Sequence, residues 1–425
     1  MADSSRRAVL TGLGILSPIG HTPASFWESL LAGKSGVRAI QTFDASKLPC
    51  RIGGEVPDFS AKSMIDKGYR KALNAMSRPV QMGTIASQFA MQDAGLAKGS
   101  LTPERFGIEF ASVMAATELD DFARSSKLAA NCKPRAIDMA KWGDPGLKEI
   151  PPLWMLKYLP NMPACHVSIL YDAQGPSNTL ISGETAGILC FAEAFRILRR
   201  SLADFMLIGG SDSKMNPMSM SRFNSFAPLT KNNEAPASAI RPFDRDSDGT
   251  ALGEGGVAFG LEELEHAKKR GAKILGEVVS SAAGFDKGRT GTGFARVIRN
   301  ALTAAGIQPS DLDHVNAHGC GSRELDAFEA RGIAGAVGSE IPVYAPLPAF
   351  GTLSAASAVI ELAASVLALH HGQLPGTLNH ANTDPACPIR VHTGAPRPIT
   401  KPYALKVAYT DLGQVAALVI KKWTE

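Results

Sequence analysis

Residues 175–187 read Gly-Pro-Ser-Asn-Thr-Leu-Ile-Ser-Gly-Glu-Thr-Ala-Gly, a pattern that predicts a strand, a sharp turn and the start of a helix. The predicted helix continues to Arg199 and ends in basic residues, which its dipole favours. Such a turn projects one side chain beneath a helix N-terminus, where negative charge is stabilised. Glu184 occupies the tip. It is either a functional group or a glutamate that only complements the helix dipole, and the turn alone leaves both interpretations open.

On both sides of this turn the chain alternates strands and helices. We expect strands at residues 8–11, 106–113, 167–171, 179–181, 205–208, 255–261, 274–280, 315–317, 403–407 and 416–421. We expect helices at residues 23–32, 78–94, 185–199, 293–305 and 354–370. This alternation, with 41 glycines for tight turns, predicts a layered α/β protein. Because no low-complexity linker divides the chain, we expect two similar halves that share one core, and we expect the Pro- and Trp-rich residues 133–163 to form a cap or an interface.

The composition excludes several classes of protein. At 425 residues, the chain is long enough for two or three domains or one large one, and its 45% hydrophobic and 20% charged residues exclude wholesale disorder. A net charge of +4 does not favour nucleic acid as a partner. Six widely spaced cysteines form neither a zinc motif nor a disulfide framework, and they favour a reducing, cytoplasmic location. Residues 1–7 are polar and we find no run of about 18 apolar residues, so no signal peptide and no membrane span are expected.

Two motifs imitate ligand-binding loops without completing them. Gly12-Leu13-Gly14 follows a strand, but Ser17 stands where a dinucleotide fingerprint needs its third glycine, so we interpret it as a tight structural turn. Residues 244–249 begin like a calcium loop, but Glu254 comes one residue too early to close it. A structural loop that pairs these aspartates with Arg241 or Arg245 is the better interpretation. We therefore expect neither a cofactor nor a metal.

His318 ends the apolar strand at 315–317 and precedes a glycine. Strand ends in α/β proteins usually carry the catalytic groups. Taken alone, a buried structural histidine is the more common arrangement, so the position makes His318 a candidate and no more.

Several segments, taken in order, resemble one family along nearly the whole chain. They are Val9–Gly20, Phe26–Gly36, Met76–Arg78, Gly209–Asp212, Arg241–Gly249 and Val315–Gly319. In these segments the chain resembles the β-ketoacyl-acyl-carrier-protein synthases, the elongating condensing enzymes of the thiolase fold. The resemblance implies a five-layer αβαβα sandwich of two pseudo-repeated halves, an N-terminal half at 1–255 and a C-terminal half at 256–425.

The residues that carry the family's chemistry are mostly replaced. In the family the tip of the sharp turn is a cysteine whose thiolate accepts the acyl chain, and the resemblance places Glu184 there. It places the first catalytic histidine on His318, the second on Gly351 and a lysine on Pro346.

The loops that would contact substrate also depart from the family. A Gly-Phe-Gly-Gly turn that supplies an oxyanion-hole amide and a gating aromatic becomes Thr-Asp-Leu-Gly, with Asp411, Leu412 and Gly413 in it. Two threonines that contact the pantetheine arm become Cys320 and Ser322.

These losses make the chain most similar to chain-length-factor subunits, which are ketosynthase-like partners without the cysteine. The resemblance implies a partner, either an active ketosynthase in a heterodimer or a second copy of this chain, and an acyl carrier protein with its phosphopantetheine arm. The alternative is an enzyme with altered chemistry on carrier-bound chains (malonyl decarboxylation, cyclisation or dehydration) that uses Glu184 and His318. Condensation through another cysteine is disfavoured. Cys190 lies six residues beyond the tip, nearly two turns along the helix, and Cys320, beside His318, is the one cysteine that is placed to matter.

Overall fold

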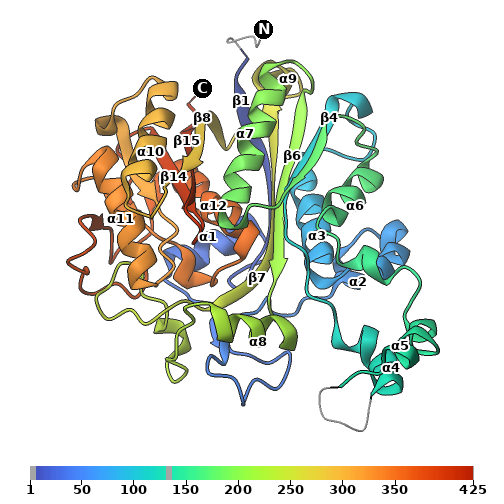
Figure 1. Cartoon of the computed structure of the whole chain (residues 1–425). Helices are drawn as coiled ribbons and strands as arrows, with labels where there is room; N and C mark the ends of the chain where they lie inside the picture. Colours follow the sequence, from blue (N-terminus) through green and yellow to red (C-terminus); the bar gives the residue numbers. More distant parts are fainter. Residues whose placement is uncertain (1–5, 131–135, 425) are drawn as a thin grey trace.

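A mixed sheet of 13 strands runs through both halves of the chain (Figure 1). The computed structural model describes residues 6–130 and 136–424, so expectations for residues 1–5 and 133–135 lie outside the described residues. Along the sheet the strands are β12 (Arg390–Val391), β10 (Pro342–Tyr344), β9 (Leu312–Asn316), β14 (Tyr403–Tyr409), β15 (Gln414–Lys421), β8 (Gly276–Phe285), β1 (Ala8–Leu16), β7 (Leu252–Glu263), β6 (Phe205–Ser213), β4 (Phe106–Ala111) and β5 (Ser177–Leu180). The short strands β2 (Val37–Ala39) and β3 (Ile52–Gly54) pair beside β7, and β11 (Gln373–Leu374) pairs with β13 (Arg397–Pro398) in a separate sheet.

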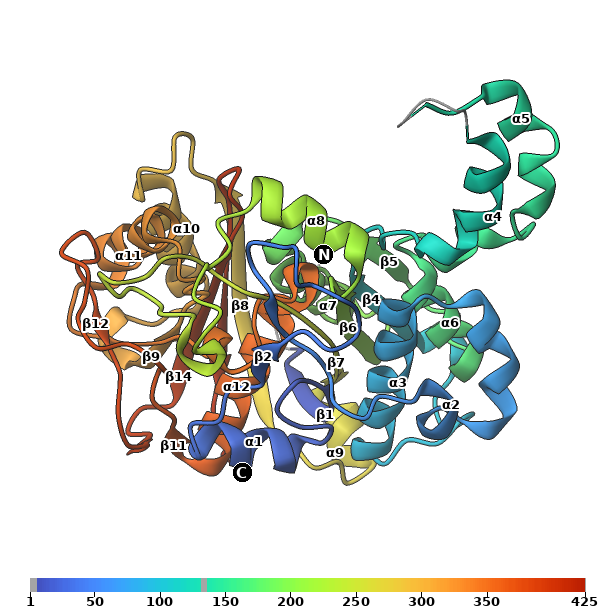
Figure 2. The same cartoon turned by 90° about the horizontal axis from the view of Figure 1, so that it is seen from below.

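Helices cover both outer faces of this sheet, and they also fill the space between the strands of its N-terminal half and those of its C-terminal half (Figure 2). They are α1 (Pro23–Leu31), α2 (Ala61–Met64), α3 (Arg78–Asp93), α4 (Leu119–Ala129), α5 (Met139–Gly143), α6 (Met162–Tyr171), α7 (Ala186–Arg199), α8 (Pro217–Phe226), α9 (Leu264–Lys269), α10 (Thr292–Ala305), α11 (Arg323–Val337) and α12 (Ser357–His371). One outer layer contains α3 and α6, the other contains α10 and α11, and α7 packs against α12 in the centre. The predicted five-layer αβαβα arrangement is confirmed. The division at residues 255 and 256 stays a prediction, and β7 runs across it.

The central helix α12 is buried at every residue from Ser357 to Leu369. A helix that is mostly apolar on every side needs such an environment. Residues 354–371 have a mean hydropathy of 1.3 over 18 residues, so by length and composition this segment could cross a membrane, although Glu361 and three serines interrupt its apolar residues. Since 83% of this segment is buried inside the protein, it is a core helix, the one that meets that test among the described residues.

The predicted strand at 167–171 is wrong, because these residues form the end of α6. Pro163 occupies the first turn, and the buried residues His166, Val167, Leu170 and Tyr171 recur at helical spacing. A five-residue apolar run does not distinguish a strand from part of a buried helix. The other predicted strands and helices are present, with ends displaced by a few residues.

The segment that contains α4 and α5 projects from the body in both views (Figures 1 and 2). It returns to the body through two short 3₁₀ turns, η3 (Gly146–Glu149) and η4 (Trp154–Lys157). The residues from 114 to 155 include many exposed apolar side chains, which are Met114, Leu119, Leu128, Ile137, Met139, Leu147, Leu153 and Met155. We call this segment, residues 114–130 and 136–160, the arm.

Candidate functional site

The turn at Glu184 joins the edge strand β5 to the central helix α7. Ile181 and Ser182 follow the strand, a 3₁₀ turn η5 spans Gly183–Thr185, and α7 begins at the next residue. Gly183 has a φ of +50°, a conformation that glycine adopts without strain. The Thr185 hydroxyl donates to the Ser182 carbonyl oxygen at 2.7 Å and closes the turn. The predicted strand, turn and helix are therefore present, with Glu184 in the turn.

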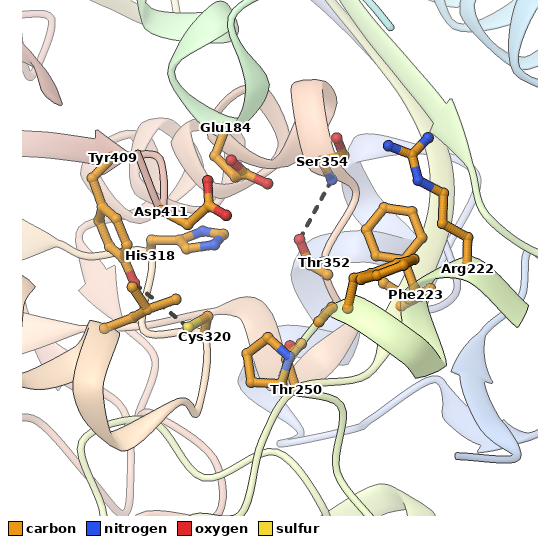
Figure 3. Close-up of a pocket in the computed structure, with 15 residues that line it drawn as sticks. Glu184, Arg222, Phe223, Thr250, His318, Cys320, Thr352, Ser354, Tyr409 and Asp411 are labelled. Atoms are coloured by element: carbon orange, nitrogen blue, oxygen red, sulfur yellow. Dashed lines mark hydrogen bonds between the residues drawn. The ribbon is translucent and has the colours of Figure 1, made fainter. Parts of the chain in front are cut away.

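Glu184 and His318 line the same cavity, which has a volume of about 340 Å³. Figure 3 shows Glu184, His318 and Asp411 grouped on one side of this pocket and Arg222 and Phe223 across from them. The groups arrive from distant parts of the chain: the first from η5, the second from the loop after β9 and the third from the turn after β14. Glu184 and His318 therefore line one cavity although they come from the ends of separate strands, and their role in a reaction stays a prediction.

His318 is held by two buried glutamates that the sequence analysis missed. Its Nδ1 lies 2.8 Å from Oε1 of Glu361 on α12, and its backbone N–H donates to Glu329 on α11 at 2.7 Å. Burial lowers the pKa of His318, but the charges of Glu361, Glu329 and Glu184 outweigh it and raise the pKa to about 9. A charged residue in an otherwise apolar helix needs a partner, so Glu361 in the middle of α12 is the sequence signal that indicates a buried ion pair or hydrogen bond at this position.

Glu184 has opposing influences on its charge. Desolvation raises the pKa of Glu184 above its ordinary value, the nearby His318 lowers it, and Asp411 and Glu361 add to the rise. The pocket therefore brings an imidazole that favours its cationic form to a carboxyl group that resists ionisation. Two such groups in one cavity are able to bind or exchange a proton with a ligand that enters.

The predicted site residues divide into those that line the pocket and those that do not. Asp411 and Cys320 line it, whereas Gly351, Pro346, Ser322, Leu412 and Gly413 lie outside its lining. The positive φ of Gly351, +77°, lets the backbone turn there, and the two side chains that enter the pocket from this loop are Thr352 and Ser354.

Ser354 has a φ of +47°, which is unusual for a residue other than glycine. Residues held in that region concentrate at functional sites, because the surrounding structure has to maintain the strain. Neither Ser354 nor Thr352 was a predicted site residue, and no sequence signal distinguishes them from ordinary loop residues.

The cysteines near the pocket are not arranged as nucleophiles. Cys320 is buried and accepts a hydrogen bond from the Tyr409 hydroxyl at 3.5 Å (Figure 3). Burial raises the pKa of the Cys320 thiol well above its ordinary value, so its thiolate is disfavoured. Cys190 is fully buried in α7, and burial raises the pKa of its thiol in the same way.

The two imitated ligand motifs have structural roles. A Cβ on Gly14 would lie 1.9 Å from the Ala86 carbonyl oxygen, so the motif at 12–14 allows α3 to pack closely on β1. Asp244 accepts three backbone N–H bonds, from Asp246, Ala381 and Asn382. Within the described residues, no cluster of His, Cys, Asp and Glu is arranged to hold a metal. The expected structural loop is present, with Arg245 Nε 3.9 Å from Asp246 Oδ2, although backbone amides rather than arginines bind Asp244.

Comparisons with known proteins agree over both halves of the chain. Residues 5–267 match the family model for the β-ketoacyl synthase N-terminal domain, and residues 272–381 match the model for its C-terminal domain. A 3-oxoacyl-[acyl-carrier-protein] synthase 2 from Synechocystis sp. is 33% identical over 427 residues, which cover 98% of each chain. The alpha subunit of the tetracenomycin polyketide synthase ketoacyl synthase from Streptomyces glaucescens is 31% identical and covers 90% of this chain and 89% of its own.

Solved structures of similar proteins superpose over almost the full length. The ishigamide ketosynthase/chain length factor is 27% identical, with a TM-score of 0.86 over 99% of this chain and 100% of that one. One chain in the structure of a type II polyketide synthase acyl-carrier protein in complex with its ketosynthase is 25% identical to this chain. Its TM-score is 0.82 over 98% of this chain and 100% of that one.

Proposed function

The chain belongs to the β-ketoacyl synthase family, and from that premise we propose that it is a ketosynthase-like subunit of a type II polyketide or fatty-acid synthase that acts as a chain length factor. In this role it does not condense acyl chains alone and works beside an active ketosynthase. The observation that carries the proposal is the position of Glu184, at the tip of the turn between β5 and α7 and in the same pocket as His318.

Glu184 is unsuited to the acyl transfer that condensation requires. Covalent acyl transfer needs an activated nucleophile such as a thiolate, whereas a carboxylate is weakly nucleophilic and would form an anhydride. Asp411 adds a second carboxylate beside the pocket, and negative charge opposes the enolate that forms when malonyl groups lose CO₂. Cys320 does not replace the lost nucleophile, because its thiol is buried and accepts a hydrogen bond from the Tyr409 hydroxyl.

Two surfaces support a partner subunit. Strand β5 is the last strand on its side of the sheet, and its residues are exposed or half-buried, so its outer backbone groups are available to another strand. The apolar side chains of the arm are exposed in the single chain, and apolar patches of this kind mark interaction sites. One of the similar structures is described as a ketosynthase/chain length factor.

The proposal is tested by purifying the chain alone and together with a ketosynthase from the same gene neighbourhood that has an intact catalytic set. We expect the lone chain to form no elongated product from acyl- and malonyl-carrier proteins, and we expect the two proteins to copurify as an active complex. If the lone chain elongates substrates, or if it binds no ketosynthase, the proposal fails.

A second candidate function is acid–base chemistry on carrier-bound chains. It is favoured by one observation, the shared pocket in which burial favours the protonated form of Glu184 and nearby carboxylates favour the cationic form of His318. Malonyl decarboxylation, cyclisation and dehydration all need such groups. Loss of turnover in Glu184→Gln, with an unchanged fold, supports this function, and an unchanged product of the assembled synthase argues against it.

A further inference from the structure

A lysine lies fully buried in the middle of strand β14. Lys406 is inaccessible to solvent, and its ammonium group has three oxygen neighbours, Glu361 Oε2 at 2.6 Å, Asn316 Oδ1 at 3.0 Å and the Asn316 carbonyl oxygen at 3.4 Å. An ammonium group carries three N–H donors, so these three acceptors use all of them. Lysine is almost never fully buried unless it is paired with an acid. A lysine placed in this way holds its acceptors in one geometry.

The carboxylate that Lys406 binds also binds His318. Glu361 accepts from Lys406 through Oε2 and contacts Nδ1 of His318 through Oε1, at 2.8 Å. Because the ionised carboxylate only accepts, Nδ1 carries the proton of this hydrogen bond. His318 lines the pocket, and Nε2 is then its ring nitrogen that is available to a ligand there.

The amide of Asn316 restricts the arrangement further. Its Nδ2 donates to the Glu361 carbonyl oxygen at 2.6 Å and to Ser365 Oγ at 2.7 Å, so both amide hydrogens are used. Ser365 Oγ also lies 2.8 Å from Nε2 of His314. Oδ1 of Asn316 therefore faces Lys406 as an acceptor, and a fully satisfied buried network of this kind is rigid.

We propose that Lys406 is a positioning residue. It holds Glu361 in the orientation that keeps the Nδ1–H of His318 hydrogen-bonded to Glu361, so that the Nε2 atom of His318 faces the pocket. Nε2 of His318 then accepts a hydrogen bond when the ring is neutral, and it donates one to the carbonyl or carboxylate oxygen of an acyl ligand when the ring is the imidazolium ion, even though the cysteine nucleophile is lacking. This role goes beyond the proposed function, because it holds both for a silent subunit and for an acid–base enzyme.

The charged groups around His318 come from every element that packs against it. Glu361 approaches from α12, Glu329 and Asp326 from α11, Glu184 from η5, and Tyr409 and Asp411 from the end of β14. Neighbouring carboxylates favour the imidazolium ion, whereas the ammonium of Lys406 is a like charge that disfavours it.

The experiment follows His318 in the full chain by NMR after labelling of the histidine side chains, with its signal assigned from its loss in His318→Gln. The wild-type midpoint is expected at about 9. Glu361→Gln should lower it by about 1–3 pH units, the usual effect of one close opposite charge. Lys406→Met no longer holds Glu361 against Nδ1, so above the midpoint part of the neutral ring should move to the Nε2–H form. The matched control is Lys421→Met on the neighbouring strand β15, which removes a half-buried lysine away from the pocket and should leave the midpoint and the tautomer unchanged.

A change of charge at position 406 alone does not change which ring nitrogen of His318 carries the proton. If Lys406→Met leaves the neutral ring fully in the Nδ1–H form, or if Glu361→Gln leaves the midpoint unchanged, the proposal is overturned. Should Lys406→Met fail to fold, the wild-type protein still decides, because its ¹⁵N shifts above the midpoint report which ring nitrogen is protonated. A neutral Nδ1–H ring supports the proposal, and a neutral Nε2–H ring contradicts it. Neither result depends on whether the chain condenses acyl groups.

Discussion

At the scale of single residues, the pocket brings two carboxyl groups and an imidazole together, and the proposed function places Glu184 where condensation needs a nucleophile. Glu184 and Asp411 add acid where condensation would create further negative charge, with His318 beside them and Arg222 across the pocket. Removing one donor to a developing oxyanion commonly costs about 3–4 kcal/mol of transition-state stabilisation. On the proposed function, a carboxyl group at this position therefore affects the reaction much more than the fold.

Cys320 provides a direct test of nucleophilicity. We predict that iodoacetamide at neutral pH modifies Cys320 at least about tenfold more slowly than the half-buried Cys165, because burial raises the pKa of the Cys320 thiol and disfavours its thiolate. Mass spectrometry of peptides after timed quenching measures both rates. Unfolding in urea should abolish the difference, and equally fast labelling in the folded protein would contradict the account of the pocket.

Glu109 on β4 provides a pH-dependent prediction. Burial, aided by Glu193 and opposed by Arg196, raises its pKa to about 8 from about 4.5 in the unfolded chain. The folded state therefore binds the extra proton, and this contribution to stability, present at low pH, is lost as pH rises from about 4.5 to 8. Glu109→Gln should remove the loss and stabilise the protein at pH 8 by about 2 kcal/mol, after allowance for solvent screening.

Urea unfolding of the wild type and Glu109→Gln at pH 5, 6, 7 and 8 measures this difference. The two free energies of unfolding should be similar at pH 5 and should separate as the pH rises. Parallel curves across this range would show that Glu109 is charged in the folded protein.

At the scale of elements, much of the layered order could be predicted and the contacts within the site could not. The alternation of apolar strands and amphipathic helices predicted the elements that position Glu184 and His318, because burial on a known face leaves a periodic pattern. The same logic failed for residues 167–171, where a short run fits either structure. Glu361 and Lys406 lie 45 residues apart in the sequence, and no local pattern indicates that they meet.

The packing of α3 on β1 gives a prediction at this scale. A Cβ at Gly14 would overlap the Ala86 carbonyl oxygen at 1.9 Å, whereas one at Gly276 on β8 would meet its nearest atom at 3.3 Å. Gly14→Ala should lower the free energy of unfolding by about 3 kcal/mol or prevent folding, and Gly276→Ala should cost less than about 1 kcal/mol. Thermal and urea unfolding of the two variants compare them, and equal stabilities would contradict this packing.

At the scale of the whole molecule, the residues that the structure describes leave β5 as a sheet edge and the apolar side chains of the arm exposed. We predict that Met139→Glu and Leu153→Glu, both on exposed positions of the arm, weaken binding to the ketosynthase at least about tenfold and leave the fold unchanged. Leu202→Glu, at an exposed apolar position outside the arm, is the matched control and should bind normally. Calorimetric titration measures the three affinities, and equal weakening in all three variants would exclude the arm as the specific contact.

The measurement that tests the central claim most directly is the intact mass of each subunit after the complex is incubated with an acyl-carrier-protein substrate. The account predicts that the ketosynthase partner gains the mass of the acyl group and that this chain, with Glu184 at the turn, gains none. An acyl adduct on this chain, together with elongation by the chain alone, would contradict it.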